Sequence, residues 1–146
     1  MRAGPHLSEY RLRRRVQFHE CDSAGIVHFS WFFRYMAEAE HAMWREAGLS
    51  IAPPGADVAF PRVSTSFDFH QPMRFEDEFD VVIRIAAMTD KTIRYTCSIL
   101  RGDVEVATGV MVVACVSAKP GQPMKAISIP PTIASRFAIA PGSEAS

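Results

Sequence analysis

One short segment brings together residue types that can act on a carbonyl group. Residues 21–29 read CDSAGIVHF, in which Asp22 supplies a carboxylate, Gly25 allows a turn, and the next residues begin a helical pattern. The first turn of a helix has backbone N–H groups without intrahelical partners, and such donors can stabilise the oxyanion that forms when a carbonyl is attacked. The segment therefore predicts carbonyl chemistry centred on Asp22.

A strand before this segment and a long helix after it must hold the segment in place. From Tyr10 to Phe18, apolar residues alternate with basic or polar ones, which predicts a half-buried strand, although Arg14 interrupts the pattern. The basic residues favour a solvated strand face over a nucleic-acid site. Ser30 is the expected N-cap of the helix, and Gly48 is its expected stop. The apolar positions at helical spacing are Phe32, Met36, Ala39, Met43 and Ala47.

Four more strands are expected after the proline and glycine residues at 53–55. They span residues 58–69, 78–88, 92–100 and 104–117, and we expect them to form an antiparallel meander. Residues 104–117 are apolar on both faces, which is typical of a strand in the middle of a sheet. Pro130 and Pro131 predict a short terminal helix that reaches as far as Phe137. One helix on a curved antiparallel sheet is an α+β architecture.

Length and composition indicate a single domain without a nucleic-acid or membrane partner. The 146 residues are expected to form one domain, with a core at about 8–118 and a C-terminal extension with a short helix at 119–146. The net charge of +0 provides no field that steers nucleic acid, and no apolar run is long enough to cross a bilayer. The three scattered cysteines favour a reducing cytoplasm over a disulfide framework. One helix cannot cover both sheet faces, so we expect a large uncovered apolar patch and a homodimer.

The motif at residues 18–29 resembles a known enzyme signature. The sequence FHECDSAGIVHF, followed by a helix that contains Arg34 and Tyr35, is similar to the 4-hydroxybenzoyl-CoA thioesterase-like family of hotdog-fold acyl-CoA thioesterases. Residues 74–78, RFEDE, resemble the turn before the third strand of that family. The resemblance implies a hotdog fold, in which a curved antiparallel sheet wraps around one long helix. It also implies a cytoplasmic enzyme that hydrolyses acyl-CoA to the free acid and CoA.

The resemblance further implies roles for named residues and partners. Asp22 would be the nucleophile, through a mixed anhydride, or the general base for a water molecule, and the backbone amide of Phe29 would polarise the carbonyl. Gly25 would let the backbone approach the substrate closely, and His28 would line the pocket or donate to the substrate. Lys91 aligns with a basic turn that contacts the CoA phosphates. A homodimer or dimer of dimers is expected, with sites at the dimer interface, no metal, and no cofactor apart from the CoA of the substrate.

Other interpretations of the same residues stay open. Asp22 can be an Asx-turn residue, His28 a structural histidine and Lys91 an exposed turn lysine. Cys21 is an alternative nucleophile. His19, Cys21, Asp22 and His28 include metal-ligand types, but no second ligand pair with zinc spacing follows.

The remaining candidates concern the phosphate groups, the acyl pocket and the reaction type. Other basic residues that could meet CoA are Arg62, Arg74 and Arg101, and the alternative carboxylates on the helix are Glu38 and Glu40. Phe32, Phe33, Phe60 and Phe67 could shape an aromatic pocket or simply fill the core. The alternative functions are a hydratase or dehydratase of acyl thioesters and a non-catalytic module that binds acyl-CoA.

Overall fold

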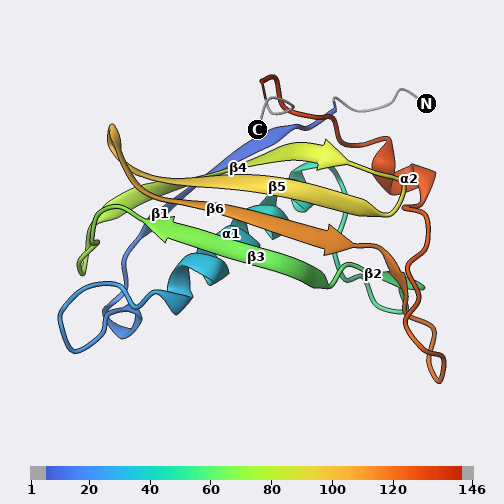
Figure 1. Cartoon of the computed structure of the whole chain (residues 1–146), viewed down its shortest axis with the longest axis horizontal. Helices are drawn as coiled ribbons and strands as arrows, with labels where there is room; N and C mark the ends of the chain where they lie inside the picture. Colours follow the sequence, from blue (N-terminus) through green and yellow to red (C-terminus); the bar gives the residue numbers. More distant parts are fainter. Residues whose placement is uncertain (1–5, 143–146) are drawn as a thin grey trace.

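The computed structural model describes residues 6–142 and shows one long helix against a curved sheet (Figure 1). The helices are α1 (Ser30–Glu46), the short α2 (Pro131–Ala134) and a 3-10 turn, η1 (Phe18–Glu20). The strands are β1 (Glu9–Arg15), β2 (Val58–Ala59), β3 (Arg62–Phe69), β4 (Glu78–Met88), β5 (Thr92–Arg101), β6 (Val104–Ala114) and β7 (Val116–Ser117). The main sheet has the antiparallel order β1-β4-β5-β6-β3, and β2 pairs with β7. The predicted α+β architecture is confirmed.

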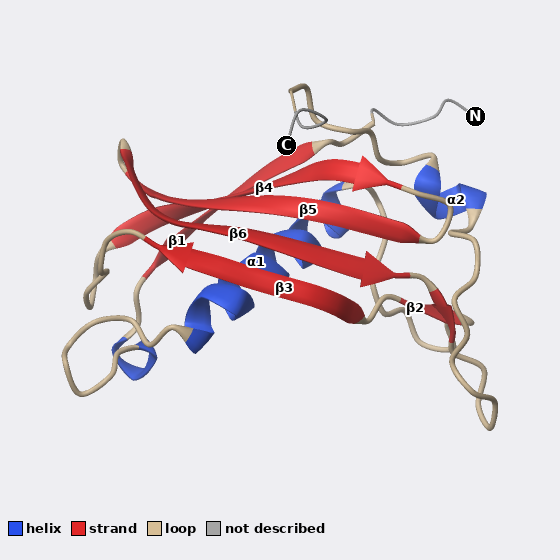
Figure 2. Ribbon diagram, viewed as in Figure 1, coloured by secondary structure: helices blue, strands red, loops and turns tan. Residues whose placement is uncertain are grey.

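Helix α1 packs across one face of the main sheet (Figure 2). Its buried stripe includes Met36, Ala39 and Met43, which are at most 1% exposed, as the helical spacing predicts. Trp44 and Tyr95 are fully buried, and the indole Nε1 of Trp44 donates to the Tyr95 hydroxyl at 3.0 Å. The helix therefore forms one wall of the core and fixes where the segment before it meets the sheet.

The order of the strands differs from the predicted meander. Only β4, β5 and β6 follow one another, while β3 crosses to the far edge and pairs with β6. The expected strand 58–69 is interrupted at Phe60 and Pro61, and the expected strand 104–117 is interrupted at Cys115. Proline has no N–H for a ladder hydrogen bond, which explains the first break. Because β6 lies between β5 and β3, its predicted central position is confirmed.

The first strand ends earlier than its alternation predicts. β1 stops at Arg15, and Phe18 lies in η1 with 76% of its surface exposed, so its predicted place on the buried strand face is wrong. The reason is that Gln17 and Glu20 form a capping box, which turns the chain into a 3-10 helix. The prediction of Ser30 as N-cap is also wrong, because Phe29 occupies that position and the helix begins at Ser30.

The C-terminal extension packs against the core rather than trailing from it. The terminal helix ends at Ala134 and not at Phe137, which instead forms a bridge with Leu7 and packs against Trp44 with ring centroids 5.3 Å apart. The Nη1 of Arg136 donates to the carbonyl of Ala47 at 2.6 Å and so caps the end of α1. Part of the extension, residues 143–146, lies outside the described residues.

The uncovered face of the sheet is more polar than predicted. On β5, Arg94, Thr96 and Ser98 alternate with the buried residues, so the expected large apolar patch is not found on this central strand. On the edge strand β1, Arg11 pairs with Asp80 at 2.7 Å, in agreement with a solvated strand face. The other edge, β3, is exposed along most of its length, and its Val63 is 60% exposed.

None of the helices in the described part of the chain is long and apolar enough to span a membrane. A cytoplasmic location stays a prediction.

Candidate active site

A cleft of about 480 Å³ opens where β3 ends and α1 begins. The segment that precedes α1 forms one wall, and the segment that follows β3 forms the other. The lining residues are Asp22, Ile26, Val27, Phe29, Phe32, Phe69, His70, Gln71, Pro72 and Met73. The cleft is therefore mostly apolar, with one carboxylate, one imidazole and one amide.

Asp22 occupies a tight turn and also faces the cleft. Its Oδ1 accepts hydrogen bonds from the amides of Ala24 at 2.8 Å and Ile26 at 3.5 Å, which is the Asx turn weighed for this residue. Gly25 has a φ of +78°, a conformation that favours glycine, but it does not line the cleft. The Oδ2 of Asp22 accepts no hydrogen bond from residues 6–142. One oxygen therefore holds the turn, and the other is available for chemistry.

The backbone amide of Phe29 is a second available group in the same cleft. The amide of His28 donates to the carbonyl of Glu20 at 2.9 Å, and the amide of Ser30 donates to Nδ1 of His28 at 3.3 Å. Between them, the N–H of Phe29 has no acceptor among the described residues, as expected for the first positions of a helix. Phe29 also lines the cleft. The structure thus brings the predicted carboxylate and the predicted amide donor together.

The other polar residues of the motif lie outside the lining. The Nδ1 of His28 lies 2.8 Å from the hydroxyl of Ser30, so its ring is held at the start of the helix. His19 sits in η1 and packs against Trp31, with ring centroids 5.3 Å apart. The Sγ of Cys21 lies 3.9 Å from the carbonyl of Gln17. Within the described residues, no cluster of three or more His, Cys, Asp and Glu side chains could hold a metal ion.

The sequence did not single out His70 and Gln71, which follow β3 directly. Both amides donate to the carbonyl of Val106, at 2.8 Å and 3.1 Å, and His70 Nε2 lies 3.2 Å from the Thr108 hydroxyl. In the sequence, His70 and Gln71 fall between two predicted strands, in segment 70–77. They are far from Asp22 along the chain, so the sequence does not show that they lie near it in the fold. No local pattern in the sequence identifies them, because the pairing of β3 with β6 brings them to the cleft.

The aromatic candidates divide between the cleft and the core. Phe32 lines the cleft, while Phe60 is buried against Trp44, with ring centroids 4.9 Å apart. Phe67 packs edge-on against Phe33 at 5.2 Å and covers Gly109, where a Cβ would come within 2.7 Å of the Phe67 ring. The aromatic side chains of Phe29 and Phe69 also line the cleft, although neither ring was among the predicted aromatic candidates.

Comparison with known proteins identifies the family. The family model described as the thioesterase-like superfamily matches residues 16–137. The chain belongs to this superfamily. A 1,4-dihydroxy-2-naphthoyl-CoA hydrolase of Synechococcus sp. (strain CC9311) is 28% identical over 110 residues, which cover 69% of this chain and 72% of the relative. Membership of this family makes the protein an enzyme, a thioesterase, as the resemblance of the motif implied.

Solved structures show that the fold is the hotdog fold, as predicted. A 1,4-dihydroxy-2-naphthoyl-CoA thioesterase from Synechocystis superposes with a TM-score of 0.80 at 21% identity, covering 88% of this chain and 95% of that chain. A 4-hydroxybenzoyl-CoA thioesterase variant in complex with 4-hydroxybenzoyl-CoA has a TM-score of 0.79 at 19% identity, with 90% and 99% covered.

The alternative carboxylates and most of the basic candidates of this thioesterase are engaged elsewhere. Glu38 and Glu40 do not line the cleft; Glu38 pairs with Arg14 at 3.0 Å. Arg62 pairs with Glu40 at 2.9 Å. Arg101 donates to the Pro72 carbonyl at 2.8 Å and to Asp77 at 3.2 Å. These side chains hold the walls of the cleft and the core in place.

Lys91 lies at the opposite end of the sheet from the cleft. Phe69, in the cleft, is level with Ile99 across β6, whereas Lys91 immediately precedes Thr92 at the start of β5. The separation from Ile99 to Lys91 is eight residues, or roughly 26 Å at about 3.3 Å per residue. Within one chain, Lys91 therefore does not reach the cleft that contains Asp22.

Proposed function

We propose that this thioesterase hydrolyses aromatic acyl-CoA thioesters in the cleft at the start of α1. The observation that carries the proposal is the pairing of two available groups, Asp22 Oδ2 and the N–H of Phe29, in one largely apolar cleft. A thioester needs an oxygen delivered to its carbonyl carbon and a donor for the oxyanion that results. The thiolate of CoA is already a good leaving group, so the mechanism uses no metal and no cofactor beyond the CoA of the substrate.

Asp22 can deliver the oxygen by either of two routes. As nucleophile, its Oδ2 attacks the carbonyl carbon, the C–S bond breaks, and the mixed anhydride is then hydrolysed by water. As general base, Asp22 takes a proton from a water molecule that attacks the same carbon, and the proton then passes to the departing thiolate. In both routes the N–H of Phe29 donates to the oxyanion, and the positive end of α1 adds to this stabilisation.

The walls of the cleft favour an aromatic acyl group. Phe29, Phe32 and Phe69 contribute aromatic rings, and Met73 adds a flexible apolar side chain. The naphthoyl-CoA and hydroxybenzoyl-CoA named for the relatives also carry aromatic acyl groups. His70 and Gln71 add polar groups that can bind hydroxyl substituents on such a ring.

We also propose that two copies of the chain pair through β3. This strand is an edge, mostly exposed, and carries the exposed apolar side chains Val63 and Phe69, whereas the other edge, β1, is rich in arginine. An edge with few charged residues is the one on which strands pair, and a highly charged one resists pairing. The charged residues of β3 are Arg62 and Asp68, of opposite sign. In an antiparallel pair, the sheet of the second copy runs in the opposite direction. The end of that sheet that bears Lys91 then lies beside the cleft of the first copy. Lys91 of a second copy and Arg74, beside Met73, would then bind the CoA phosphates.

The test is thiol release from a panel of aromatic and aliphatic acyl-CoA esters, with sedimentation measured on the same sample. We expect turnover of at least one aromatic acyl-CoA, with a higher kcat/KM than for aliphatic esters, and a dimer or larger assembly. Failure to release thiol from any ester contradicts the function, and a preference for aliphatic esters contradicts the aromatic class. Hydration without thiol release would indicate a hydratase, and binding without turnover a non-catalytic module. A monomer that is fully active contradicts the pairing.

A further inference from the structure

The glutamate two residues before Asp22 is completely buried. Glu20 has 0% of its surface exposed, although it lies in η1 at the edge of the molecule. A buried carboxylate is strongly unfavourable unless hydrogen bonds and charges compensate it. Glu20 is not among the residues that line the cleft, so its side chain does not face the site proposed for the substrate. Its partners must therefore explain its presence.

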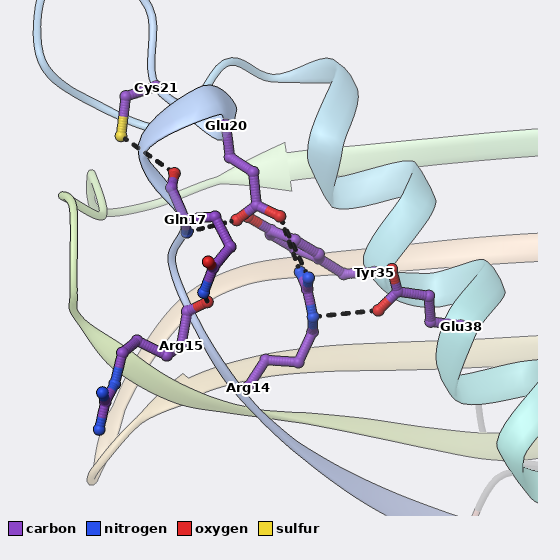
Figure 3. Close-up of polar contacts among 7 residues, drawn as sticks. All are labelled: Arg14, Arg15, Gln17, Glu20, Cys21, Tyr35 and Glu38. Carbon is purple, nitrogen blue, oxygen red and sulfur yellow. Dashed lines mark hydrogen bonds and ion pairs between the residues drawn. The ribbon is translucent and has the colours of Figure 1, made fainter.

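Three elements supply those partners (Figure 3). From β1, Nη1 and Nη2 of Arg14 donate to Glu20 Oε2 at 3.2 Å and 3.1 Å. From the start of η1, the amide of Gln17 donates to Oε1 at 2.9 Å. From α1, the hydroxyl of Tyr35 donates to the same oxygen at 2.8 Å. Both carboxylate oxygens are thus fully engaged, and the side chain ties the strand, the turn and the helix together.

The partners of Glu20 are themselves constrained. The guanidinium of Arg14 lies 4.7 Å from the centroid of the Tyr35 ring and also pairs through Nε with Glu38 at 3.0 Å. Burial, and then the hydrogen bond to Glu20, raise the pKa of Tyr35 well above its ordinary value, so its hydroxyl keeps the proton that it donates. The hydrogen bonds and ion pairs of Glu20, Arg14 and Tyr35 can all form together in one arrangement of the side chains. This makes the network rigid.

The backbone of Glu20 connects this network to both reacting groups. Its carbonyl accepts the hydrogen bond from the amide of His28 at 2.9 Å, and the adjacent Cys21 and Val27 form an antiparallel bridge. These contacts close the base of the turn that contains Asp22. Asp22 is two residues after Glu20, and Phe29 is one residue after His28. The position of Glu20 thus determines how far the Asp22 carboxylate lies from the N–H of Phe29.

We propose that Glu20 is a positioning residue for thioester hydrolysis, which holds the Asp22 turn and the start of α1 at the separation that the reaction needs. It acts through Arg14, Tyr35 and the backbone of His28 and does not touch the substrate. A displacement of about 1 Å between reacting groups can lower a rate about a hundredfold. The inference rests on the roles proposed above for Asp22 and Phe29.

The test is Glu20→Gln, which keeps the shape of the side chain but turns an amide group toward the donors of Arg14. We expect kcat, referred to the folded fraction at the assay temperature, to fall about tenfold to a hundredfold, with KM changed less than about twofold. Tyr35→Phe removes one donor and keeps the ring, and we expect a fall in kcat of about threefold to tenfold. The matched control is Glu78→Gln, which removes a half-exposed carboxylate that pairs with Arg13 and Arg15 on the neighbouring strand and should leave kcat unchanged.

The outcomes separate this inference from the proposed function. If Glu20→Gln and Tyr35→Phe lower the melting temperature but leave kcat of the folded enzyme unchanged, Glu20 is only structural and the inference is overturned. If Glu20→Gln does not fold, the kcat of Tyr35→Phe alone decides. If the unmodified enzyme releases no thiol from any acyl-CoA, or Asp22→Asn is fully active, the proposed function fails and this inference fails with it.

Discussion

Two buried glutamates, Glu20 beside the first turns of α1 and Glu40 in its second half, differ in how completely they are bound. Both are 0% exposed, and they are the charged side chains buried in the described part of the protein. Glu20 has donors on both oxygens, from Arg14, the amide of Gln17 and Tyr35. Glu40 accepts from Arg62 at 2.9 Å through Oε1, while its Oε2 has no hydrogen-bond partner among residues 6–142.

The difference indicates what each end of α1 does. A carboxylate without a partner for one oxygen is better tolerated with its proton on, and burial raises the pKa of Glu40 in that direction. A carboxylate that holds a turn beside reacting groups needs every partner, because each hydrogen bond removes a freedom of movement. The start of α1 is therefore organised for geometry, and its second half for packing. The following predictions test this contrast, from the largest expected effect to the smallest.

Asp22→Asn should lower kcat by about 10² to 10⁴ without lowering the melting temperature. Asparagine keeps the Oδ1 acceptor for the amides of Ala24 and Ile26, so the turn is preserved while the reactive oxygen is lost. Thiol release and thermal melting measured on the same preparation check both halves. Asp57→Asn is the control, since this aspartate is exposed and does not line the cleft. Full activity of Asp22→Asn would contradict a chemical role for Asp22 at this end of the helix.

Phe137→Ala should lower the free energy of unfolding by about 3–5 kcal/mol, because it opens a cavity beside Trp44. We expect kcat of the folded fraction to stay near that of the unmodified enzyme, since the cleft is at the opposite end of α1. Urea denaturation measures the stability. The control is Ile139→Ala, two positions further along at a side chain that is 45% exposed, where the loss should be much smaller. Equal losses at both positions would contradict the packing role.

Arg136→Ala should lower the free energy of unfolding by about 1 kcal/mol. The substitution removes the hydrogen bond to the Ala47 carbonyl that caps the end of α1. Thermal melting is the measurement, and Lys125→Ala, at an exposed position, is the control. A melting temperature equal to that of the unmodified protein would show that water replaces the arginine without loss.

Glu40→Gln should change how the melting temperature depends on pH, more than it changes the melting temperature at any single pH. Because the pKa of Glu40 is raised in the folded protein, unfolding above the ordinary pKa releases a proton, and stability falls as the pH rises through the folded pKa. The glutamine variant lacks this fall, so its melting temperature relative to the unmodified protein should increase as the pH rises above the ordinary carboxyl pKa of 4.5. The pKa of His41, lowered mainly by burial, gives the opposite slope. Because its Nε2 lies 3.7 Å from Glu40 Oε1, both proteins are compared in a His41→Gln background, which lacks this slope. A constant difference across this range would show that Glu40 is charged when folded.

The sequence predicts the local elements better than their pairing. The period of α1 and the Asp22 motif are local patterns, and the structure places the carboxylate and the helix start in one cleft. The pairing of β3 with β6 joins residues far apart in the chain, and nothing in either strand alone specifies it. For the same reason His70 was missed, since only the crossing of β3 brings it to Asp22.

Glu20 shows a second limit of local patterns. In the sequence it stands among polar residues next to a predicted active-site turn, which indicates a solvated carboxylate. Its burial depends on Arg14 from β1 and Tyr35 from α1 meeting over the same turn. The interruption of the β1 alternation at Arg14 was visible in the sequence, and this residue proves to be the bridge between Glu20 and Glu38.

The bridge between Leu7 and Phe137 has a consequence for how the protein folds. It joins a segment before the first strand to one after the last strand, and Phe137 completes the packing around Trp44. Helix α1 and the sheet can form before this contact, but the core around Trp44 stays open to water until Phe137 packs against it. Closing a contact across so much chain is slow compared with forming a helix or a hairpin. The start of α1 can therefore be in place while the opposite end of the helix is still unsealed.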